Sequence, residues 1–107
     1  MVRASGFASA LAFALLVAAA PARADVTVAI GHGSFDPAQV KIKKGESVIF
    51  HNVQEMPGGH TVVADDGSWK SPPLALEEKF TKRFEQSGIA KIHLEQHPHV
   101  TGEIVVE

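Results

Sequence analysis

The stretch "FDPAQVKIKKGESVIFHN", residues 35–52, decides the fold class of this chain. Within it, Val40 and Ile42 alternate with lysines, and residues 47–51 form a mostly apolar run. The turn at Lys44-Gly45-Glu46 separates the two runs. A repeat of two residues is typical of a β-strand with one buried face, whereas a helix would repeat every 3.6 residues. The stretch therefore predicts two strands joined by a tight turn.

The same pattern continues on both sides of this stretch. Turn signals such as Asp65-Asp66-Gly67 and Ser87-Gly88 separate short runs rich in β-branched and aromatic residues. Seven or eight short strands at intervals of about 8–12 residues predict an all-β sandwich or barrel, whose loops gather at its two ends. The clearest strands are expected at residues 26–30, 40–43, 47–51, 60–64, 80–84, 89–94 and 102–107.

The first 24 residues have the pattern of a secretory signal peptide. Arg3 precedes an apolar run at residues 7–20, which is too short to span a bilayer, and Ala22-Arg23-Ala24 forms the cleavage site. Cleavage after Ala24 leaves residues 25–107 as one domain. We expect this domain in the periplasm, without attachment to the membrane.

Composition excludes several classes of function. Arg3 and Arg23 leave with the signal peptide, so eight Lys and Arg remain against twelve Asp and Glu, a formal net charge of −4. A mildly acidic domain has no electrostatic surface for nucleic acid. The chain has no cysteine, so its core or a bound metal must hold the fold. Common catalytic motifs are also missing, and we do not expect an enzyme.

The stretch "HLEQHPHV", residues 93–100, holds three of the six histidines. Glu95, His97 and His99 occupy alternate positions, so in an extended segment their side chains would share one face. Imidazole and carboxylate donors without sulfur suit Cu²⁺, Zn²⁺ or Ni²⁺, and copper is favoured by the affinity order of divalent metals. The stretch therefore predicts a metal site, with Cu²⁺ favoured and Zn²⁺ as the alternative.

Three segments together resemble the cupredoxins, the blue-copper electron-transfer family that includes amicyanins and plastocyanins. Residues 35–52 are similar to the family pattern F-x-P followed by alternating apolar positions, G-(acidic) and a closing Asn. "EMPGGHTVVA" is similar to the loop that delivers the first histidine ligand, although Gly58-Gly59 separate Pro57 from His60. "FEQSGIAKIHLEQHPHVTGEIVVE" is similar to the closing segment. The resemblance covers residues 26–107 and implies a Greek-key β-sandwich of seven or eight strands.

The resemblance also implies where copper ligands would stand. The family takes one His from the first loop and Cys-x-x-His-x-x-Met from the last loop. His60 and His97 occupy the histidine positions, but Leu94 replaces the cysteine and Val100 replaces the methionine. Either the domain no longer binds metal, or other donors complete a different site. We predict the second outcome, with His60 and His97 joined by His99 and Glu95.

Three functions follow from these observations. The first is a periplasmic copper-binding protein that uses the loop histidines in copper handling. The second is electron transfer of the amicyanin type, which the loss of both sulfur ligands disfavours. The third is a metal-free module that binds another protein. The expected partners are the metal ion and a periplasmic redox or copper-trafficking protein, and we expect a monomer. The remaining histidines, His32, His51 and His93, are expected to face solvent or neighbouring strands.

Overall fold

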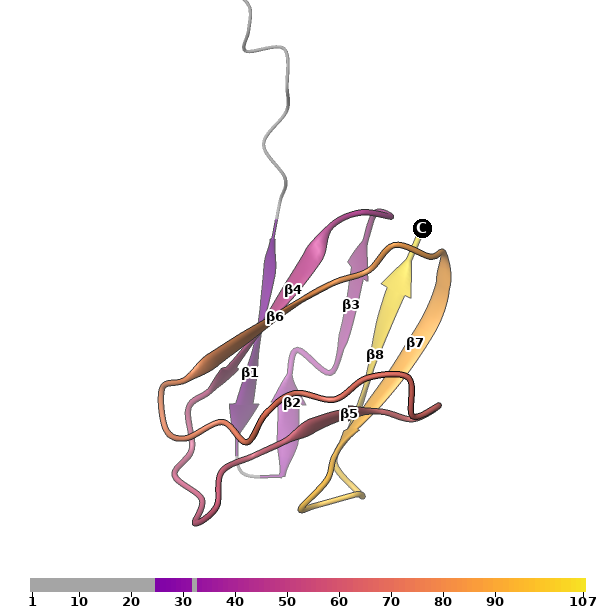
Figure 1. Ribbon diagram of the computed structural model, residues 1–107. Helices are drawn as coiled ribbons and strands as arrows, with labels where there is room; N and C mark the ends of the chain where they lie inside the picture. Colours follow the sequence, from indigo (N-terminus) through magenta and orange to yellow (C-terminus); the bar gives the residue numbers. More distant parts are fainter. Residues whose placement is uncertain (1–24, 32) are drawn as a thin grey trace, which may run out of the picture.

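A computed structural model describes residues 25–31 and 33–107 of the chain (Figure 1). The predicted signal peptide at residues 1–24 and His32 lie outside the described residues. The described part contains strands and turns but no α-helix. The strands are β1 (Val26–Gly31), β2 (Ser34–Asp36), β3 (Gln39–Ile42), β4 (Ser47–Asn52), β5 (Val62–Ala64), β6 (Lys79–Arg83), β7 (Gly88–Leu94) and β8 (Thr101–Val106).

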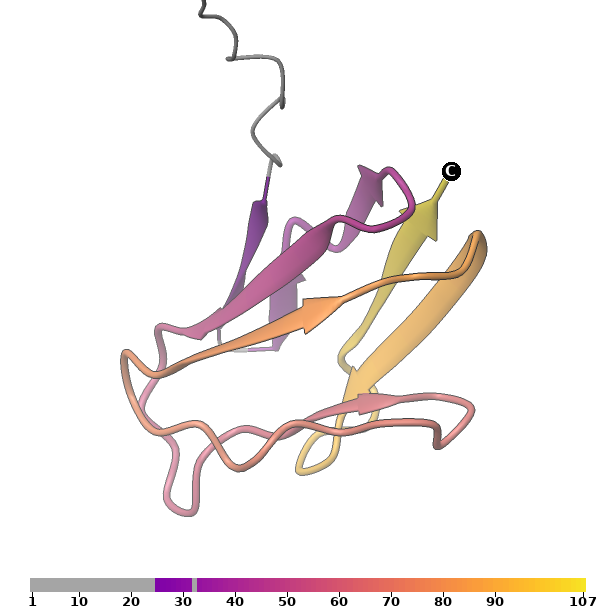
Figure 2. The ribbon, with the colours of Figure 1, turned by 45° about the horizontal axis from the view of Figure 1, so that its top comes forward.

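The strands form two four-stranded sheets that face each other (Figures 1 and 2). The first sheet has the order β2-β1-β4-β6 and the second has the order β3-β8-β7-β5. The pairs β1–β4 and β3–β8 are parallel, and the other neighbours are antiparallel. The predicted all-β sandwich is therefore confirmed.

The turn after β3 carries the chain from the second sheet to the first. Gly45 has a positive φ of 92°, a conformation that side-chain-bearing residues rarely adopt. The amide of Glu46 donates to the carbonyl of Lys43 at 3.0 Å, and the amide of Gly45 donates to the carbonyl of Phe84 at 2.7 Å. The two predicted strands of residues 35–52 are thus joined by a tight turn, and they belong to opposite sheets.

The inner faces of both sheets form one hydrophobic core. Phe50 is fully buried at its centre, with its ring 6.4 Å from that of Phe35 and 6.1 Å from that of Trp69, measured between centroids. The alternation read from the sequence is confirmed, since the buried side chains occupy alternate strand positions. The core residues are Val28, Ile30, Phe35, Val40, Ile42, Val48, Phe50, Val62, Leu74, Phe84, Ile92, Leu94, Val100, Ile104 and Val106.

Two strands differ from the expectation. The three-residue strand β2 was not predicted, because only Phe35 within it is buried and a single apolar residue gives no alternation. Strand β5 begins at Val62 rather than at residue 60. His60 instead forms an isolated bridge with Leu74, and this pairing fixes its position outside the sheets.

The loops at residues 53–61 and 95–100 lie at the same end of the sandwich, opposite the C-terminus (Figures 1 and 2). Strands β4 and β7, which lead into these loops, belong to different sheets. The sandwich therefore brings His60 and the last loop together from distant parts of the sequence. The described part of the chain contains no membrane-spanning helix.

Strand β7 offers a matched test of the core assignment. Ile92 is 1% exposed and Ile89 is 62% exposed. We expect Ile92→Val to lower the free energy of unfolding by about 0.5–1.5 kcal/mol, because it removes a buried methyl group and leaves a small cavity. Ile89→Val should change it by less than about 0.5 kcal/mol. Urea denaturation of both variants measures the difference, and equal losses would contradict the assignment.

Candidate metal centre

Asn52, the last residue of β4, organises the first loop. Its side chain is fully buried, and all of its polar atoms have partners. The amide nitrogen donates to the carbonyl of Leu74 at 2.8 Å. The oxygen Oδ1 accepts from the amide of Gln54 at 3.1 Å and lies 2.9 Å from Nδ1 of His60. Because buried polar groups are costly when unpaired, this arrangement fixes the loop against the sandwich.

These contacts determine the tautomer of a neutral His60. Since Nδ2 of Asn52 donates to Leu74, its Oδ1 faces His60 and can only accept. Nδ1 of His60 must therefore carry the hydrogen and donate it. The neutral ring then carries its lone pair on Nε2, so a metal bound by this tautomer would be bound through that nitrogen.

The backbone of His60 is held equally firmly. Its amide donates to the carbonyl of Leu74 at 3.0 Å, and its carbonyl accepts from the amide of Leu74 at 2.8 Å. Gly59 precedes it with a φ of 82°, and a Cβ at this position would lie 3.0 Å from the backbone nitrogen and oxygen of Leu74. Only glycine fits this close approach without strain. The paired glycines of the loop thus allow His60 to reach Leu74.

The last loop closes on itself through backbone hydrogen bonds. The amide of Leu94 donates to the carbonyl of Val100 at 3.1 Å, and the amide of Val100 donates to the carbonyl of His97 at 2.9 Å. Leu94 is 0% exposed and Val100 is 2% exposed, so both side chains belong to the core. The positions that the family resemblance assigns to sulfur ligands are therefore filled by buried hydrocarbon.

The three predicted histidine ligands lie in a row. The ring centroids of His60 and His97 are 6.0 Å apart, and those of His97 and His99 are 5.9 Å apart. His60 is buried, His97 is half-buried and His99 is exposed. Because a metal lies about 2.0–2.1 Å from an imidazole nitrogen, two rings at this separation can share one ion with adjustment of their side chains.

Glu95 takes part in an ion pair at the surface. Its carboxylate lies 3.6 Å from Nζ of Lys70, and both side chains are exposed. The segment is not extended as the shared-face argument assumed, because β7 ends at Leu94 and the chain turns at once. Among the described residues, no group of three or more His, Asp or Glu stands ready to hold a metal ion. Metal binding by His60, His97, His99 and Glu95 stays a prediction.

Gln96 joins the two loops, and no pattern in the sequence had singled it out. Its Oε1 accepts from the amide of Thr61 at 2.9 Å, and its Nε2 donates to the hydroxyl of Thr61 at 3.0 Å. The amide of Glu95 also donates to the carbonyl of Thr61 at 2.9 Å. These contacts set the separation of His60 and His97, since each histidine is next to one of the linked residues.

Two further histidines pair with carboxylates. Nδ1 of His93 lies 2.6 Å from Oδ1 of Asp65, and Nε2 of His51 lies 2.7 Å from Oε1 of Glu77. Both pairs are partly exposed. They face neighbouring segments, as the sequence predicted, and neither ring takes part in the row formed by His60, His97 and His99.

The donor set decides which metal chemistry fits. A blue-copper site does not fit, because the chain has no cysteine and both sulfur positions hold buried aliphatic side chains. A nitrogen-based site fits better, because two imidazoles already lie close together at the junction of the loops. Such ligands suit Cu²⁺ among the common divalent ions.

No protein-family model matches the chain. Amicyanin from Paracoccus denitrificans is 27% identical over 85 residues, which are 77% of this chain and 65% of amicyanin. This chain therefore spans slightly less than two thirds of the length of that curated relative.

Solved structures show the same likeness. A variant of amicyanin in its reduced Cu(I) form superimposes with a TM-score of 0.70 at 28% identity, over 86% of this chain and 90% of that chain. A copper-containing nitrite reductase from Thermus scotoductus gives a TM-score of 0.73 at 27% identity, over 87% of this chain but 25% of the reductase.

The link between the loops can be tested without any metal. Gln96→Ala leaves the buried amide of Thr61 without its acceptor, so we expect the free energy of unfolding to fall by about 1–3 kcal/mol. Amide hydrogen exchange at Thr61 should also become faster. Glu95→Ala is the matched control, because it removes only an exposed ion pair and should leave exchange at Thr61 unchanged. Unchanged exchange in the Gln96 variant would show that its side chain does not join the loops.

Proposed function

We propose that this chain, which is similar to amicyanin in sequence and fold, is an exported cupredoxin-like protein that binds copper through His60 and His97, completed by His99. The observation that carries this proposal is the 6.0 Å separation of the His60 and His97 rings, at the junction of two loops that are fixed without metal. Copper is the cargo in this function, held and passed on in the periplasm. A copper-trafficking or redox protein of the same compartment is the proposed partner.

Each histidine has a different part in the proposed site. His60 is the fixed ligand, because Asn52 and Leu74 hold its ring and its backbone. It would bind through Nε2, since Nδ1 is bonded to Asn52. His97 stands between the other two rings and would supply the second nitrogen. His99 is exposed, its ring centroid lies 5.9 Å from that of His97, and it would supply the third nitrogen.

Glu95 is the proposed oxygen donor, and binding a metal would require it to break its ion pair with Lys70. Its carboxylate must leave Lys70, an exposed pair worth at most about 1 kcal/mol. A carboxylate ligand would favour Cu²⁺ and Zn²⁺ over Cu⁺, because the hard oxygen suits divalent ions. The site is therefore proposed to hold Cu²⁺, with Zn²⁺ as the competing metal.

Electron transfer is the second candidate, and the structural likeness to amicyanin favours it. Rapid electron transfer needs one ligand set that serves both copper oxidation states. Soft sulfur ligands help to hold Cu(I), and here Leu94 and Val100 offer none. Storage or transfer of the ion agrees better with this donor set than a redox cycle does. The comparison with the nitrite reductase adds no catalytic group, and no enzymatic activity is proposed.

Calorimetric titration with Cu²⁺ tests the binding function. Wild-type protein should bind one ion, and saturation should raise the melting temperature, because a ligand that binds only the folded state stabilises it. His97→Ala should weaken binding by at least about tenfold, since it removes the central imidazole. His93→Gln is the control, because His93 pairs with Asp65 outside the row. A metal-free module would show no metal-dependent melting, and equal affinities of all variants would exclude the proposed ligands.

Spectroscopy of the loaded protein tests the type of site. Without a thiolate, the Cu²⁺ protein should lack the intense visible band of blue copper and should give an axial EPR spectrum with wide hyperfine splitting. Leu94→Cys should create that band, because the new thiolate would stand between His60 and His97 in the family register. Val63→Cys, on the outer face of β5, is the control. A colourless Leu94→Cys protein that binds Cu²⁺ would contradict this placement.

A further inference from the structure

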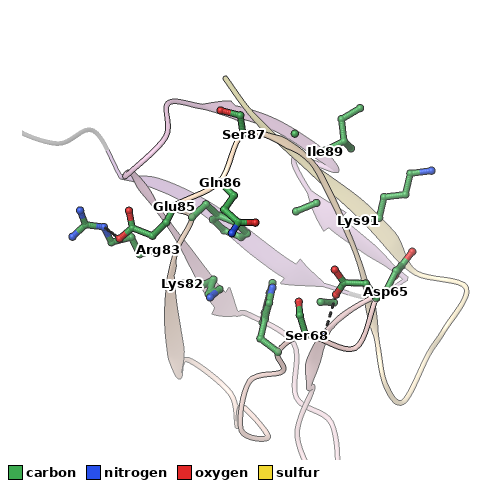
Figure 3. Close-up of a pocket in the computed structure, with 15 residues that line it drawn as sticks. Asp65, Ser68, Lys82, Arg83, Glu85, Gln86, Ser87, Ile89 and Lys91 are labelled. Carbon is green, nitrogen blue, oxygen red and sulfur yellow. Dashed lines mark hydrogen bonds and ion pairs between the residues drawn. The ribbon is translucent and has the colours of Figure 1, made fainter.

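A pocket lies on the flank of the sandwich, away from the candidate metal centre (Figure 3). It has a volume of about 570 Å³ and lies between the turn after β5, the end of β6 and the start of β7. No residue of the loops at 53–61 and 95–100 lines this pocket. This volume is within the range of about 300–1,000 Å³ that is usual for small-molecule sites.

The acidic residues of the pocket already have partners. Asp65 pairs with His93 at 2.6 Å, and Glu85 pairs with Nε of Arg83 at 2.6 Å. Asp66 accepts from the amide of Ser68 at 2.9 Å, and the hydrogen bonds from Ser68 lower its pKa. Each of these three carboxylates already has a partner within the protein, so they do not indicate that the ligand is a cation.

Lys82 and Lys91 are the pocket cations without an ion pair among the described residues, and Lys82 is the one that lies toward the middle (Figure 3). It occupies an inward-facing position on β6, between Phe80 and Phe84. Its Nζ lies 5.6 Å from the ring centroid of Trp69 and 5.9 Å from that of Phe84. Within the described part of the chain it makes no ion pair, whereas Arg83 beside it does. An ammonium held over two rings, without a carboxylate, is suited to receive an anion.

The pocket also has an apolar wall. Trp69 is half-buried, and its ring meets that of Phe84 edge-on with the centroids 6.0 Å apart. Ala90 packs against the same core. In Figure 3, Lys82 and Gln86 lie toward the middle of the pocket, whereas Arg83 and Lys91 point outward from its rim. A ligand in the middle would therefore meet one cation, one amide and an aromatic surface.

We propose that this pocket binds a small aromatic carboxylate, with its carboxylate on Lys82 and its ring against Trp69. The flat ring matches the half-buried aromatic surface of Trp69, and the negative charge matches the ammonium of Lys82 in the middle of the pocket. This site is separate from the copper site, because the two share no residue. Its failure would therefore leave the copper proposal untouched.

NMR titration with 2-naphthoate tests the proposal on the metal-free protein. Trp69 is the only tryptophan of the chain, so its indole N–H gives one signal that reports on the pocket. This signal and the amides of residues 86–90 should shift in a saturable way. Lys82→Met should weaken binding by about tenfold, because it removes a charge-assisted hydrogen bond and keeps the apolar stem.

Two controls make the test decisive. Lys79→Met changes a lysine of the same strand at an exposed position, and the affinity for 2-naphthoate should stay at the wild-type value. The neutral isostere 2-naphthamide should bind wild-type protein more weakly and should not respond to Lys82→Met. Equal binding of the acid and the amide would overturn the role of Lys82. Shifts confined to other surfaces, or none up to the solubility limit, would overturn the site.

Discussion

The position of His60 at the loop end of the sandwich depends on the buried hydrogen bonds of Asn52. One side chain joins the end of β4, the carbonyl of Leu74 and the ring of His60, and none of its polar atoms is left unpaired. Strand β4 is itself fixed between β1 and β6 in the first sheet. The sandwich therefore determines the position of His60 through β4 and Asn52. A metal that binds there finds its first ligand already placed, which lowers the cost of ordering the site.

The last loop is also held in place without a metal, because Leu94 and Val100 anchor its two ends in the core. In a metal-closed loop, the ion would link the two ends, but here the ends meet through a backbone hydrogen bond and bury hydrocarbon. The loss of the sulfur donors therefore need not cost the fold, because the replacing side chains extend the core. Gln96 then ties this loop to Thr61, and the two loops form one unit before any ligand is bound.

The sequence predicted the fold well where burial repeats regularly. Val40 and Ile42 alternate with lysines, and the strand they predict is present, whereas β2 has only Phe35 to signal it. The family resemblance brought His60 and His97 together correctly, although their separation in sequence is large. It gave no sign of Gln96, because a glutamine in a loop has no periodic pattern. The pairing of Glu95 with Lys70 was equally hidden, since it depends on how two distant turns meet.

The exposure of the three histidines bears on what a metal could do here. His60 is buried and held, His97 is half-buried, and His99 is exposed. Within the part of the chain that the structure describes, the ring of His99 makes no hydrogen bond that would fix it. A redox centre benefits from rigid ligands that change little between oxidation states, whereas a site that takes up and releases an ion needs one ligand that can move. The proposed site runs from a buried, held histidine to an exposed one, which agrees with the second requirement and would place the exposed end at the surface, where the proposed partner could receive the ion.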